Sequence, residues 1–586
     1  MERNPQALSD HVFDVLIIGG GIYGATAAWE ASLRGLSVAL IERGDFASGT
    51  SANSLKIIHG GLRYLQHLDL KRVRESVRER RILLSIAPHL VHPLPCVMPT
   101  YGHLMKGSEV MRLGLLANDL LSFDRNRLAD PDKWIPAGRV ISRKQVLELL
   151  PGIDPAGVTG GACWTDAQMY NSERVTLGFL FSAAREGAQL ANYVEATRLL
   201  CKEGRVIGVH ARDSLSGATF DIRARVVVNA AGGWVNELLA ASGLPQVPMR
   251  LSTAMNIIVR RQLLDGYAAG VYGRFSYPTP KGGLYGGRHV LFMAPWRGRT
   301  IIGTFHRPYH DAQVRLVVTE QEVEQFLQEV NSAYPGAPLH AEEVLFVHKG
   351  FLPMDGINPK TGEVVLTKHY RLHDHGRAGG PEGLISVVGV KYTTARDVAE
   401  KLIDMALRKL GHEPTPSASR ARPLMGGEIT RFSSFLEEAT ARTRDSLTPE
   451  QVRHLVFTYG SEYQRILAYG KEDAELLRPV HGAGEVLQAE VVHAAREEMA
   501  CTLSDALLRR TDLGSAGYPG DEPVVSCANL MAKELRWSPQ RLAKETDEAR
   551  RACRPEYEAG PTADRTPAKM VIRSQEKVLE RAGQKG

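Results

Sequence analysis

The most constraining feature of this 586-residue chain is a glycine-rich turn that follows an apolar run near the N-terminus. The run, residues 14–18, is continuous and rich in β-branched side chains, which is typical of a central parallel strand. Gly19, Gly21 and Gly24 follow with G-x-G-x-x-G spacing, and a helix is expected from there to about residue 34. The order of strand, glycine turn and helix predicts a βαβ unit.

The three glycines suit a dinucleotide phosphate site. Gly19 would allow the tight turn, Gly21 would let the backbone approach a pyrophosphate, and Gly24 would let the helix pack on the strand. Free N–H groups and the helix dipole favour negative charge at that point. Glu42 ends the next apolar run, where a carboxylate accepts hydrogen bonds from an adenosine ribose. These residues predict a bound dinucleotide and leave open whether it is FAD or NAD.

A second motif, which distinguishes the two cofactors, follows Glu42. Residues 49–65 read GTSANSLKIIHGGLRYL, so hydroxyl groups, one imidazole, a Gly-Gly pair and a cation come in quick succession. This segment resembles the FAD-dependent glycerol-3-phosphate dehydrogenase family, of the aerobic, quinone-linked type. In that family a serine- and threonine-rich stretch leads into an H-G-G-L-R-Y motif beside the flavin. The resemblance implies FAD as the cofactor.

The resemblance continues in order from residue 14 to about residue 550. It implies an α/β fold with three parts: a Rossmann-type FAD-binding domain of the glutathione-reductase-like kind, an antiparallel β substrate domain, and a C-terminal α-helical domain. The further segments that carry it are residues 80–90, 227–235, 295–304, 383–396 and 495–511.

The domain boundaries are predicted from where these patterns change. The FAD-binding domain is expected to be discontinuous, because the later flavin-type segments return to it after long excursions. A polar, unpatterned end predicts a disordered tail. The predicted ranges are 1–12 for an N-terminal segment, 13–98, 155–245 and 355–420 for the FAD-binding domain, 99–154 and 246–354 for the substrate domain, 424–556 for the helical domain and 559–586 for the tail.

Composition limits the classes of partner and the compartment. A formal charge of +6 is a mild excess that would help an anionic substrate or membrane surface, and no basic stripe with interleaved aromatic residues indicates nucleic-acid binding. Six scattered cysteines without C-x-x-C spacing predict reduced thiols and no metal site. No stretch reaches the roughly 18 apolar residues that cross a bilayer. We expect a cytoplasmic location, soluble or peripheral on the inner membrane face, and leave a homo-oligomer open.

The candidate catalytic residues come from the two motif segments. Oxidation of a secondary alcohol by a flavin requires hydride transfer to the ring and a base for the hydroxyl proton. His59 is the candidate base, because the Gly-Gly pair after it would let the backbone lie flat against a ring. Arg63 and Tyr64 resemble the substrate-facing pair of the family, and Lys391 resembles a lysine near phosphate and flavin. A satisfied structural histidine and an outward-facing salt-bridge lysine are the alternatives.

The cofactor contacts are assigned to turns that resemble the flavin-side turns of the family. One of them is a small-residue turn after an apolar strand, which lets the backbone pass close to the cofactor. The predicted cofactor-binding residues are Gly19, Gly21, Gly24, Glu42, Thr50, Ser51, Gly60, Gly61, Ala230, Gly232, Gly389 and Thr393.

The substrate side departs from the family pattern at several positions. Thr253 stands where the family has a lysine, Asn256 replaces a histidine, and Leu352 replaces an arginine thought to hold phosphate. His306 ends a segment where the family reads G-T-T-D. Each lost charged hydrogen bond should weaken an anion site by about 1.5–3 kcal/mol. Lys368, Asn256 and His306 are the predicted substrate-binding residues, unless the substrate is a different compound.

Three functions remain open. The leading hypothesis is oxidation of sn-glycerol 3-phosphate to dihydroxyacetone phosphate, with electrons passed from FAD to a quinone or other acceptor. The alternative is an FAD-dependent oxidoreductase or oxidase of the same superfamily that acts on another small hydroxy or amino compound, which the substrate-side departures favour. The third is a flavin-binding protein that has lost turnover, against which the retained His59, Arg63 and Lys391 argue.

Two helical patterns lie outside these motifs. Apolar residues at helical spacing predict a helix face that either packs on the substrate domain or dips into a lipid surface or quinone-access region. The densest basic run alternates with glutamates, which favours a solvated helix face over an anion site. The apolar face consists of Leu113, Leu116, Ala117, Leu120 and Leu121, and the basic run of Arg72, Arg74, Arg78, Arg80 and Arg81.

Overall fold

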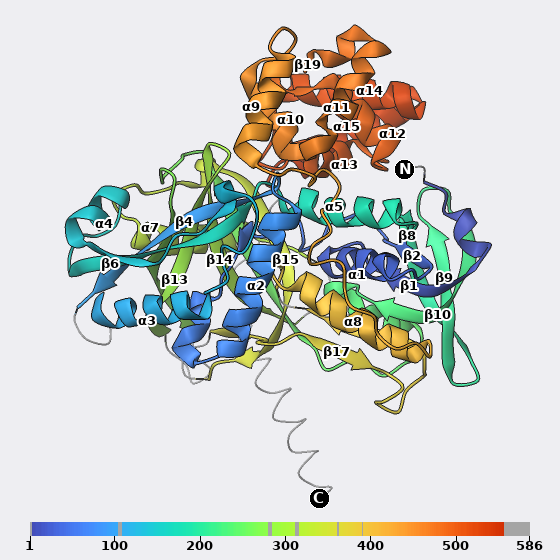
Figure 1. Ribbon diagram of the computed structural model, residues 1–586, viewed down its shortest axis with the longest axis horizontal. Coiled ribbons are helices and arrows are strands. Elements are labelled where there is room, and N and C mark those ends of the chain that lie inside the picture. The colour runs from blue at the N-terminus through green and yellow to red at the C-terminus, as the bar shows by residue number, and fades with distance from the viewer. Residues whose placement is uncertain are drawn as a thin grey trace, which may run out of the picture.

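Two β-sheets and a helical part make up the computed structural model (Figure 1). The two sheets lie side by side, and the helical part rests on one end of them. The predicted α/β fold with an antiparallel second sheet and a C-terminal helical domain is confirmed. The predicted tail lies outside the described residues, which are 3–102, 108–278, 284–310, 316–359, 363–389 and 391–555.

The first sheet has eight strands and is parallel at its centre. Its main order is β17-β18-β10-β1-β2-β7, with β8 and β9 attached to β10. Strands far apart in the chain are therefore neighbours, and only β17 runs antiparallel along the main order. The bounds are β1 Val12–Ile18, β2 Val38–Ile41, β7 Gln189–Ala191, β8 Val194–Lys202, β9 Arg205–Asp213, β10 Thr219–Asn229, β17 Arg371–Asp374 and β18 Leu384–Val388.

Helices cover both faces of this sheet, which explains why its central strands are apolar throughout. One face packs against α1 (Ile22–Leu33), α5 (Ser172–Arg185) and α8 (Ala395–Lys409). The other face packs against α6 (Val235–Ala241) and the β8–β9 pair. Tight packing of α1 against α5 is visible in the Trp29–Phe179 ring pair, with centroids 5.4 Å apart.

The second sheet has ten strands and is antiparallel except between β4 and β12. Helix α7 (Glu320–Ala333) packs on one face, with the rings of Phe305 and Phe326 in contact. The order is β16-β15-β11-β14-β13-β12-β4-β6-β3, with β5 on β6. The bounds are β3 Ile57–Ile58, β4 Val91–Tyr101, β5 Arg139–Ser142, β6 Val158–Met169, β11 Arg250–Val259, β12 Ala268–Pro278, β13 Leu284–Trp296, β14 Arg299–Tyr309, β15 Val344–Ile357 and β16 Val364–Leu366.

The C-terminal part is mostly helical and carries one small hairpin, β19 (Pro479–Val480) and β20 (Ala483–Leu487). Its helix starts are encoded locally: Thr448 forms a capping box and Pro449 occupies the first helical turn. It lies over α5 in Figure 1. Its helices are α9 Phe432–Thr443, α10 Pro449–Tyr459, α11 Tyr463–Ala468, α12 Gln488–Glu497, α13 Leu503–Asp505, a π-helical turn Ala506–Arg510, α14 Asp521–Leu535 and α15 Pro539–Ala552.

Three helices remain: α2 (Leu70–Ile86), α3 (Ser108–Leu121) and α4 (Arg143–Leu149). The leucine stripe of α3 faces outward: Leu113, Leu116 and Leu120 are 67%, 55% and 77% exposed. The helix packs instead through Leu115, which is buried with the β4–β6 core. The helix therefore packs on the second sheet, as one of the two alternatives has it, but its leucine stripe does not take part in that packing. No helix among the described residues is long and apolar enough to cross a membrane.

The expected solvated face for the basic run on α2 is wrong. Arg72 and Arg80 are buried, and Arg80 pairs with Asp166. Arg74 and Arg81 both pair with Asp124. Arg78 pairs with Asp397. No local pattern reveals these ion pairs, because Asp124, Asp166 and Asp397 come from distant segments of the chain.

Candidate active site

The glycine turn after β1 has the geometry of a phosphate site. Gly19 has a φ of +109°, and a Cβ there would lie 2.6 Å from the carbonyl oxygen of Ala230. A Cβ on Gly24 would lie 1.9 Å from the carbonyl oxygen of Gly19. Helix α1 begins after Gly21, which provides no side-chain cap, and no acidic residue lies in the first turn. The N-terminus therefore carries no acidic side chain and is positive, as a pyrophosphate requires.

The loop after β2 lies against this turn. The Glu42 carboxylate accepts hydrogen bonds from the N–H groups of Gly20 (2.7 Å) and Gly44 (2.8 Å). Ser51 accepts a hydrogen bond from the Ile22 N–H at 2.9 Å, so its hydroxyl caps the start of α1. Burial raises the pKa of Glu42. Glu42 and Ser51 thus flank the helix start and fit the adenosine ribose and the pyrophosphate of a dinucleotide.

Thr50 and Gly232 extend this surface. The Thr50 hydroxyl accepts from the Phe351 N–H at 3.1 Å, so the loop touches β15 of the second sheet. Gly232, with a φ of +59°, opens the short turn after β10, and nothing lies within 4 Å of a Cβ built there. Loop, turn and sheet edge together leave main-chain groups accessible around the helix start.

His59 lies at the end of β3, beside a buried carboxylate. The Nδ1 atom of His59 is 3.9 Å from Oδ2 of Asp166, which is an ion-pair distance and too long for a hydrogen bond. Asp166 also accepts from the Gly60 N–H (2.5 Å), Arg80 (2.8 Å) and the Trp164 indole (3.0 Å). Burial opposes ionisation of Asp166, but His59 and Arg80 hold its pKa well below the usual range. Asp166 is therefore a permanent anion behind the imidazole.

Asp166 was not predicted from the sequence. Its role depends on strand pairing: Ile58 lies opposite Ala167 in the β3–β6 pair, so the next residues, His59 and Asp166, become neighbours. The one local signal is an acid in an otherwise buried apolar strand, which is rare unless the acid is paired.

The other side of His59 touches the segment before α8. The main-chain N–H of His59 donates a hydrogen bond to the Thr393 hydroxyl at 3.3 Å, and Thr393 is buried. The imidazole itself is 46% exposed, so it can meet a substrate. Gly61 has a φ of +86°, and Gly389 lies so close to Tyr23 that a Cβ would fall 2.1 Å from the ring. The structure thus brings His59, Gly60, Gly61 and Thr393 into one cluster.

Lys391 points inward onto Tyr64. Its Nζ atom lies 4.1 Å from the centroid of the Tyr64 ring, and the Arg72 guanidinium lies 4.0 Å from the same centroid. Burial, and then the charge of Arg72, lower the pKa of Lys391 to about 8. The structure therefore does not place Lys391 as an outward-facing salt-bridge lysine.

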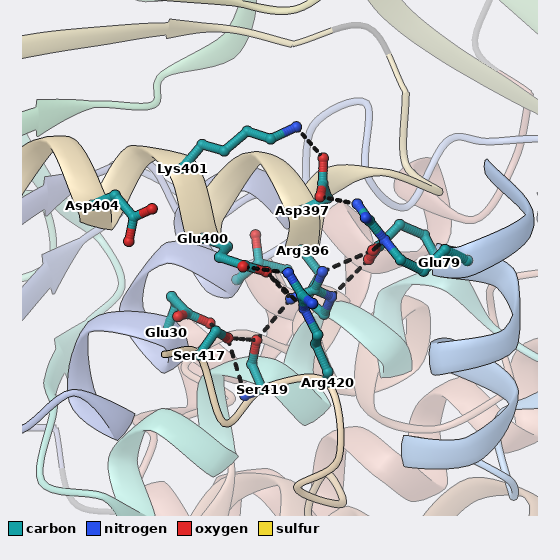
Figure 2. A network of polar contacts seen from close by, with 12 residues as sticks. Glu30, Glu79, Arg396, Asp397, Glu400, Lys401, Asp404, Ser417, Ser419 and Arg420 are labelled. Atoms are coloured by element: carbon teal, nitrogen blue, oxygen red, sulfur yellow. Dashed lines mark hydrogen bonds and ion pairs between the residues drawn. The ribbon is translucent and has the colours of Figure 1, made fainter. Parts of the chain in front are cut away.

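Helices α2 and α8, which support the two sides of this cluster, are tied together by a buried network (Figure 2). The Arg396 guanidinium binds both carboxylate oxygens of Glu79, at 2.6 and 2.7 Å. Arg396 also binds Glu400 and Ser419. Asp397, one residue on, accepts from Arg78. The network fixes Thr393 and Lys391, before α8, relative to Arg72 and Arg80 on α2.

The predicted substrate-side residues of the second sheet lie on three adjacent strands. Asn256 on β11 is buried, lies opposite His348 of β15, and accepts a hydrogen bond from the Thr304 hydroxyl at 2.8 Å. His306 on β14 lies opposite Ala254. Burial, helped by His289 and Arg63, lowers the pKa of His306 to about 4, so its imidazole is neutral at pH 7. His348, which was not predicted from the sequence, brings an imidazole beside Asn256, the position where the family resemblance implies a histidine.

The cations around this sheet are distributed unevenly. Arg63 is exposed, and within the described residues its guanidinium makes no ion pair or hydrogen bond. Thr253 is buried and hydrogen-bonds the carbonyl of Arg307, and Leu352 lies opposite Ser252. The Lys368 side chain is exposed just beyond β16, and no contact joins it to the cluster around His59 within the described chain.

Comparison with known proteins gives matches over nearly the whole chain. A sequence model of the family described as FAD dependent oxidoreductase matches residues 14–390. A second, described as the C-terminal domain of alpha-glycerophosphate oxidase, matches residues 417–542. The glycerol-3-phosphate dehydrogenase of Synechocystis sp. is 32% identical over 552 residues, which cover 93% of this chain and 96% of the relative.

An oxidase and a solved structure are also similar. The alpha-glycerophosphate oxidase of Streptococcus pyogenes is 30% identical over 604 residues, covering 93% of this chain and 95% of that one. The X-ray structure of the glycerol-3-phosphate dehydrogenase from Bacillus halodurans complexed with FAD matches with a TM-score of 0.71 and 25% identity, over 94% of this chain and 98% of that chain. The dinucleotide that the glycine turn accommodates is therefore FAD and not NAD.

Proposed function

We propose that the chain, which belongs to the FAD-dependent glycerol-3-phosphate dehydrogenase family of oxidoreductases, oxidises sn-glycerol 3-phosphate to dihydroxyacetone phosphate. The observation that carries the proposal is the chemistry of three side chains from the two motif segments, residues 49–65 and 383–396. His59 is an accessible imidazole backed by a buried anion, Arg63 is a guanidinium with no partner among the described residues, and Lys391 is a half-buried ammonium. An alcohol bearing a phosphate needs a base and cations of these kinds.

The cofactor would be held by main-chain groups and by two side chains. Gly19, Gly21 and Gly24 leave room at the start of α1 for the pyrophosphate, Glu42 would bind the ribose, and Ser51 flanks the phosphates. FAD, when bound there, supplies the hydride acceptor for the carbinol carbon. The protein then has to position the alcohol and remove its proton.

His59 is the residue that would take the hydroxyl proton. Asp166 lies on the Nδ1 side of the ring, so an N–H at Nδ1 faces the carboxylate and Nε2 remains free to accept the proton. The imidazolium that forms is stabilised by the permanent charge of Asp166. Asp166 acts here as a positioning residue through its charge, because at 3.9 Å it forms an ion pair with the imidazole and not the hydrogen bond of a hydrolase triad.

Arg63 and Lys391 would hold the phosphate. His306 is neutral at pH 7 and contributes at most a hydrogen bond, and Leu352 provides no charge. The charge of Arg63 contributes to the lowered pKa of His306, which supports a position of the guanidinium near β14 of the second sheet. Two cations from the chain segments around the flavin side thus replace those missing from the sheet.

Anaerobic reduction of the flavin tests this assignment. Glycerol 3-phosphate should bleach the bound flavin, and glycerol, which lacks the phosphate, should do so far more slowly. Lactate and amino acids serve as the comparison for the alternative that the substrate is another small hydroxy or amino compound. Bleaching by one of these, with none by glycerol 3-phosphate, would favour that alternative.

The electron acceptor is a separate part of the proposal. Relatives include proteins named as dehydrogenases and as oxidases, so both a quinone and oxygen are candidate acceptors. The outward leucines of α3 favour a quinone in a membrane, because they form an exposed apolar face.

Leu68 (81%), Leu70 (49%) and Phe123 (67%) are also exposed, near the ends of α2 and α3. We propose peripheral contact with an anionic bilayer through this face, with Lys71, Arg112 and Arg127 near it in sequence.

Vesicle binding tests the membrane contact. Wild-type protein should co-sediment with vesicles that contain anionic lipid, and a Leu116→Glu, Leu120→Glu double variant should not. Leu215→Glu is the matched control, because Leu215 is 45% exposed between β9 and β10, away from α3. Equal loss of binding in the control, or none in the double variant, would rule out this face.

A further inference from the structure

The C-terminal helical part reaches the cofactor side of the molecule through a buried ion cluster. Asp45 lies three residues after Glu42, and its carboxylate accepts two hydrogen bonds from Arg510, at 2.7 and 2.8 Å. Arg509 donates to the same carboxylate. Asp45 and Arg510 are essentially without solvent exposure. The π-helical turn Ala506–Arg510, which carries both arginines, therefore contacts the cofactor loop directly.

Asp45 is connected to the glycine turn through its own loop. The Gly20 N–H donates to Glu42, and the Ala47 N–H donates to the Gly20 carbonyl at 3.0 Å. Phe46, between them, is buried against Gly20. Residues 42–47 thus hydrogen-bond both the N–H and the carbonyl of Gly20, in the middle of the G-x-G-x-x-G turn. A shift of this loop would move the ribose carboxylate and the turn together.

A second link supports the same loop. The Asn192 side chain donates to Asp45 at 3.1 Å and to the carbonyl of Met499, in the C-terminal part, at 2.9 Å. Asp505 accepts from Arg509 at 2.8 Å and so orients this arginine toward Asp45. Burial opposes ionisation of Asp45, but Arg510 and Arg509 hold its pKa below the usual value. A charge buried this completely is costly unless its partners stay in place, so the cluster ties loop and C-terminal part to one geometry.

We propose that Arg510 and Arg509 are positioning residues of the cofactor site, and that the C-terminal helical part holds the loop of residues 42–47 in the conformation that binds FAD. The C-terminal part is then a component of the flavin site and not only a separately packed domain. This inference rests on FAD binding and is independent of the substrate. It extends the cofactor machinery to a part of the chain far from the glycine turn in sequence.

FAD affinity of full-length variants tests this role. Apoprotein of Asp45→Asn and of Arg510→Met is titrated with FAD, and the release rate of FAD from each holoprotein is measured. Both variants should bind FAD roughly tenfold more weakly or worse, since a charged hydrogen bond to a buried group is lost. The double variant should be no weaker than the worse single variant, because both changes remove the same link. Arg510→Lys should fall between wild type and Arg510→Met, because an ammonium cannot bind both carboxylate oxygens.

Arg297→Met is the matched control. Arg297, in the turn between β13 and β14, binds Ser515 and the carbonyl of Asp512, so it joins the same C-terminal part to the second sheet without touching residues 42–47. It should lower thermal stability of the apoprotein while leaving the FAD dissociation constant near the wild-type value. The proposal fails if Arg297→Met weakens FAD as much as Arg510→Met, or if Asp45→Asn binds FAD like wild type. If Arg510→Met does not fold, Asp45→Asn and Arg510→Lys decide by the same criteria.

Discussion

The two sides of the active site are built in different ways. The cofactor side consists mainly of backbone: a glycine turn, a helix start without acidic residues and a loop that hydrogen-bonds the turn. The proposed substrate side consists of side chains from separate elements: Asn256 on β11, His306 on β14 and Lys391 in the segment before α8. A backbone site depends on which residues lack a side chain, whereas a side-chain site depends on which residues strand pairing brings together.

This difference explains how the two sides tolerate change. Two positions of the glycine turn cannot take a side chain, because a Cβ at Gly19 or Gly24 would overlap carbonyl oxygens of the same turn or of its neighbour. On the sheet, by contrast, Leu352 and Asn256 occupy positions where the family resemblance implies an arginine and a histidine, and the strands still pair. We therefore expect single substitutions in the glycine turn to abolish FAD binding. Substitutions on the sheet should change the affinity for the substrate gradually.

The largest effect is expected at Gly24. Gly24→Ala places a Cβ 1.9 Å from the Gly19 carbonyl oxygen, so α1 must move away from the turn and the phosphate site is lost. The purified variant should carry no flavin, measured by its visible absorbance. Gly114→Ala on α3 is the control, because nothing lies within 4 Å of a Cβ there. A Gly24→Ala protein with normal flavin content would break the contrast between the two sides.

The next effect is expected at His59, where the two sides meet. His59→Ala should slow flavin reduction at saturating glycerol 3-phosphate by about 10²–10⁴-fold, because proton removal belongs to the chemical step. Flavin content should stay normal, since the His59 side chain is not part of the cofactor cradle. Stopped-flow reduction measures the rate, with the exposed His412→Ala as control. An unchanged rate would remove His59 as the base.

A gain in affinity is expected at Leu352. Leu352→Arg restores a guanidinium on the sheet, which can bind phosphate oxygens bidentately. The dissociation constant for glycerol 3-phosphate should fall by roughly tenfold. Leu352→Met keeps the volume without the charge and should leave the constant unchanged. If Leu352→Arg changes the dissociation constant no more than Leu352→Met does, residue 352 does not contribute to phosphate binding.

The smallest effect is a pH dependence from Lys391. Because its pKa is lowered to about 8, the ammonium loses its proton as pH rises through that value, and its attraction for an anion is lost. The phosphate is already a dianion there, so KM should rise severalfold above about pH 8 while kcat changes little. Lys391→Arg should abolish the rise, because a guanidinium stays charged. A wild-type KM that is flat from pH 7 to 10 would exclude Lys391 from the phosphate site.

The cofactor side could be predicted from the sequence, whereas much of the other side could not. The β1–turn–α1 unit and Glu42 could be predicted, because strand, glycines and acid lie within one short stretch. Asp166 could not, because only the β3–β6 register brings it to His59. The arginines of α2 were misinterpreted for the same reason, since their partners come from other elements.

The interleaved strand order has a consequence for how the protein is made. The strands β1, β10 and β18 are neighbours in one sheet, although they begin at residues 12, 219 and 384. A nascent chain on the ribosome therefore cannot complete this sheet until β18 has emerged, and Arg510 emerges later still. Flavin can stabilise only the folded form, so it joins a nearly finished polypeptide. Until then the apolar strand β1 lacks its neighbour β10, and in cells short of flavin newly made chains should be prone to aggregation and proteolysis.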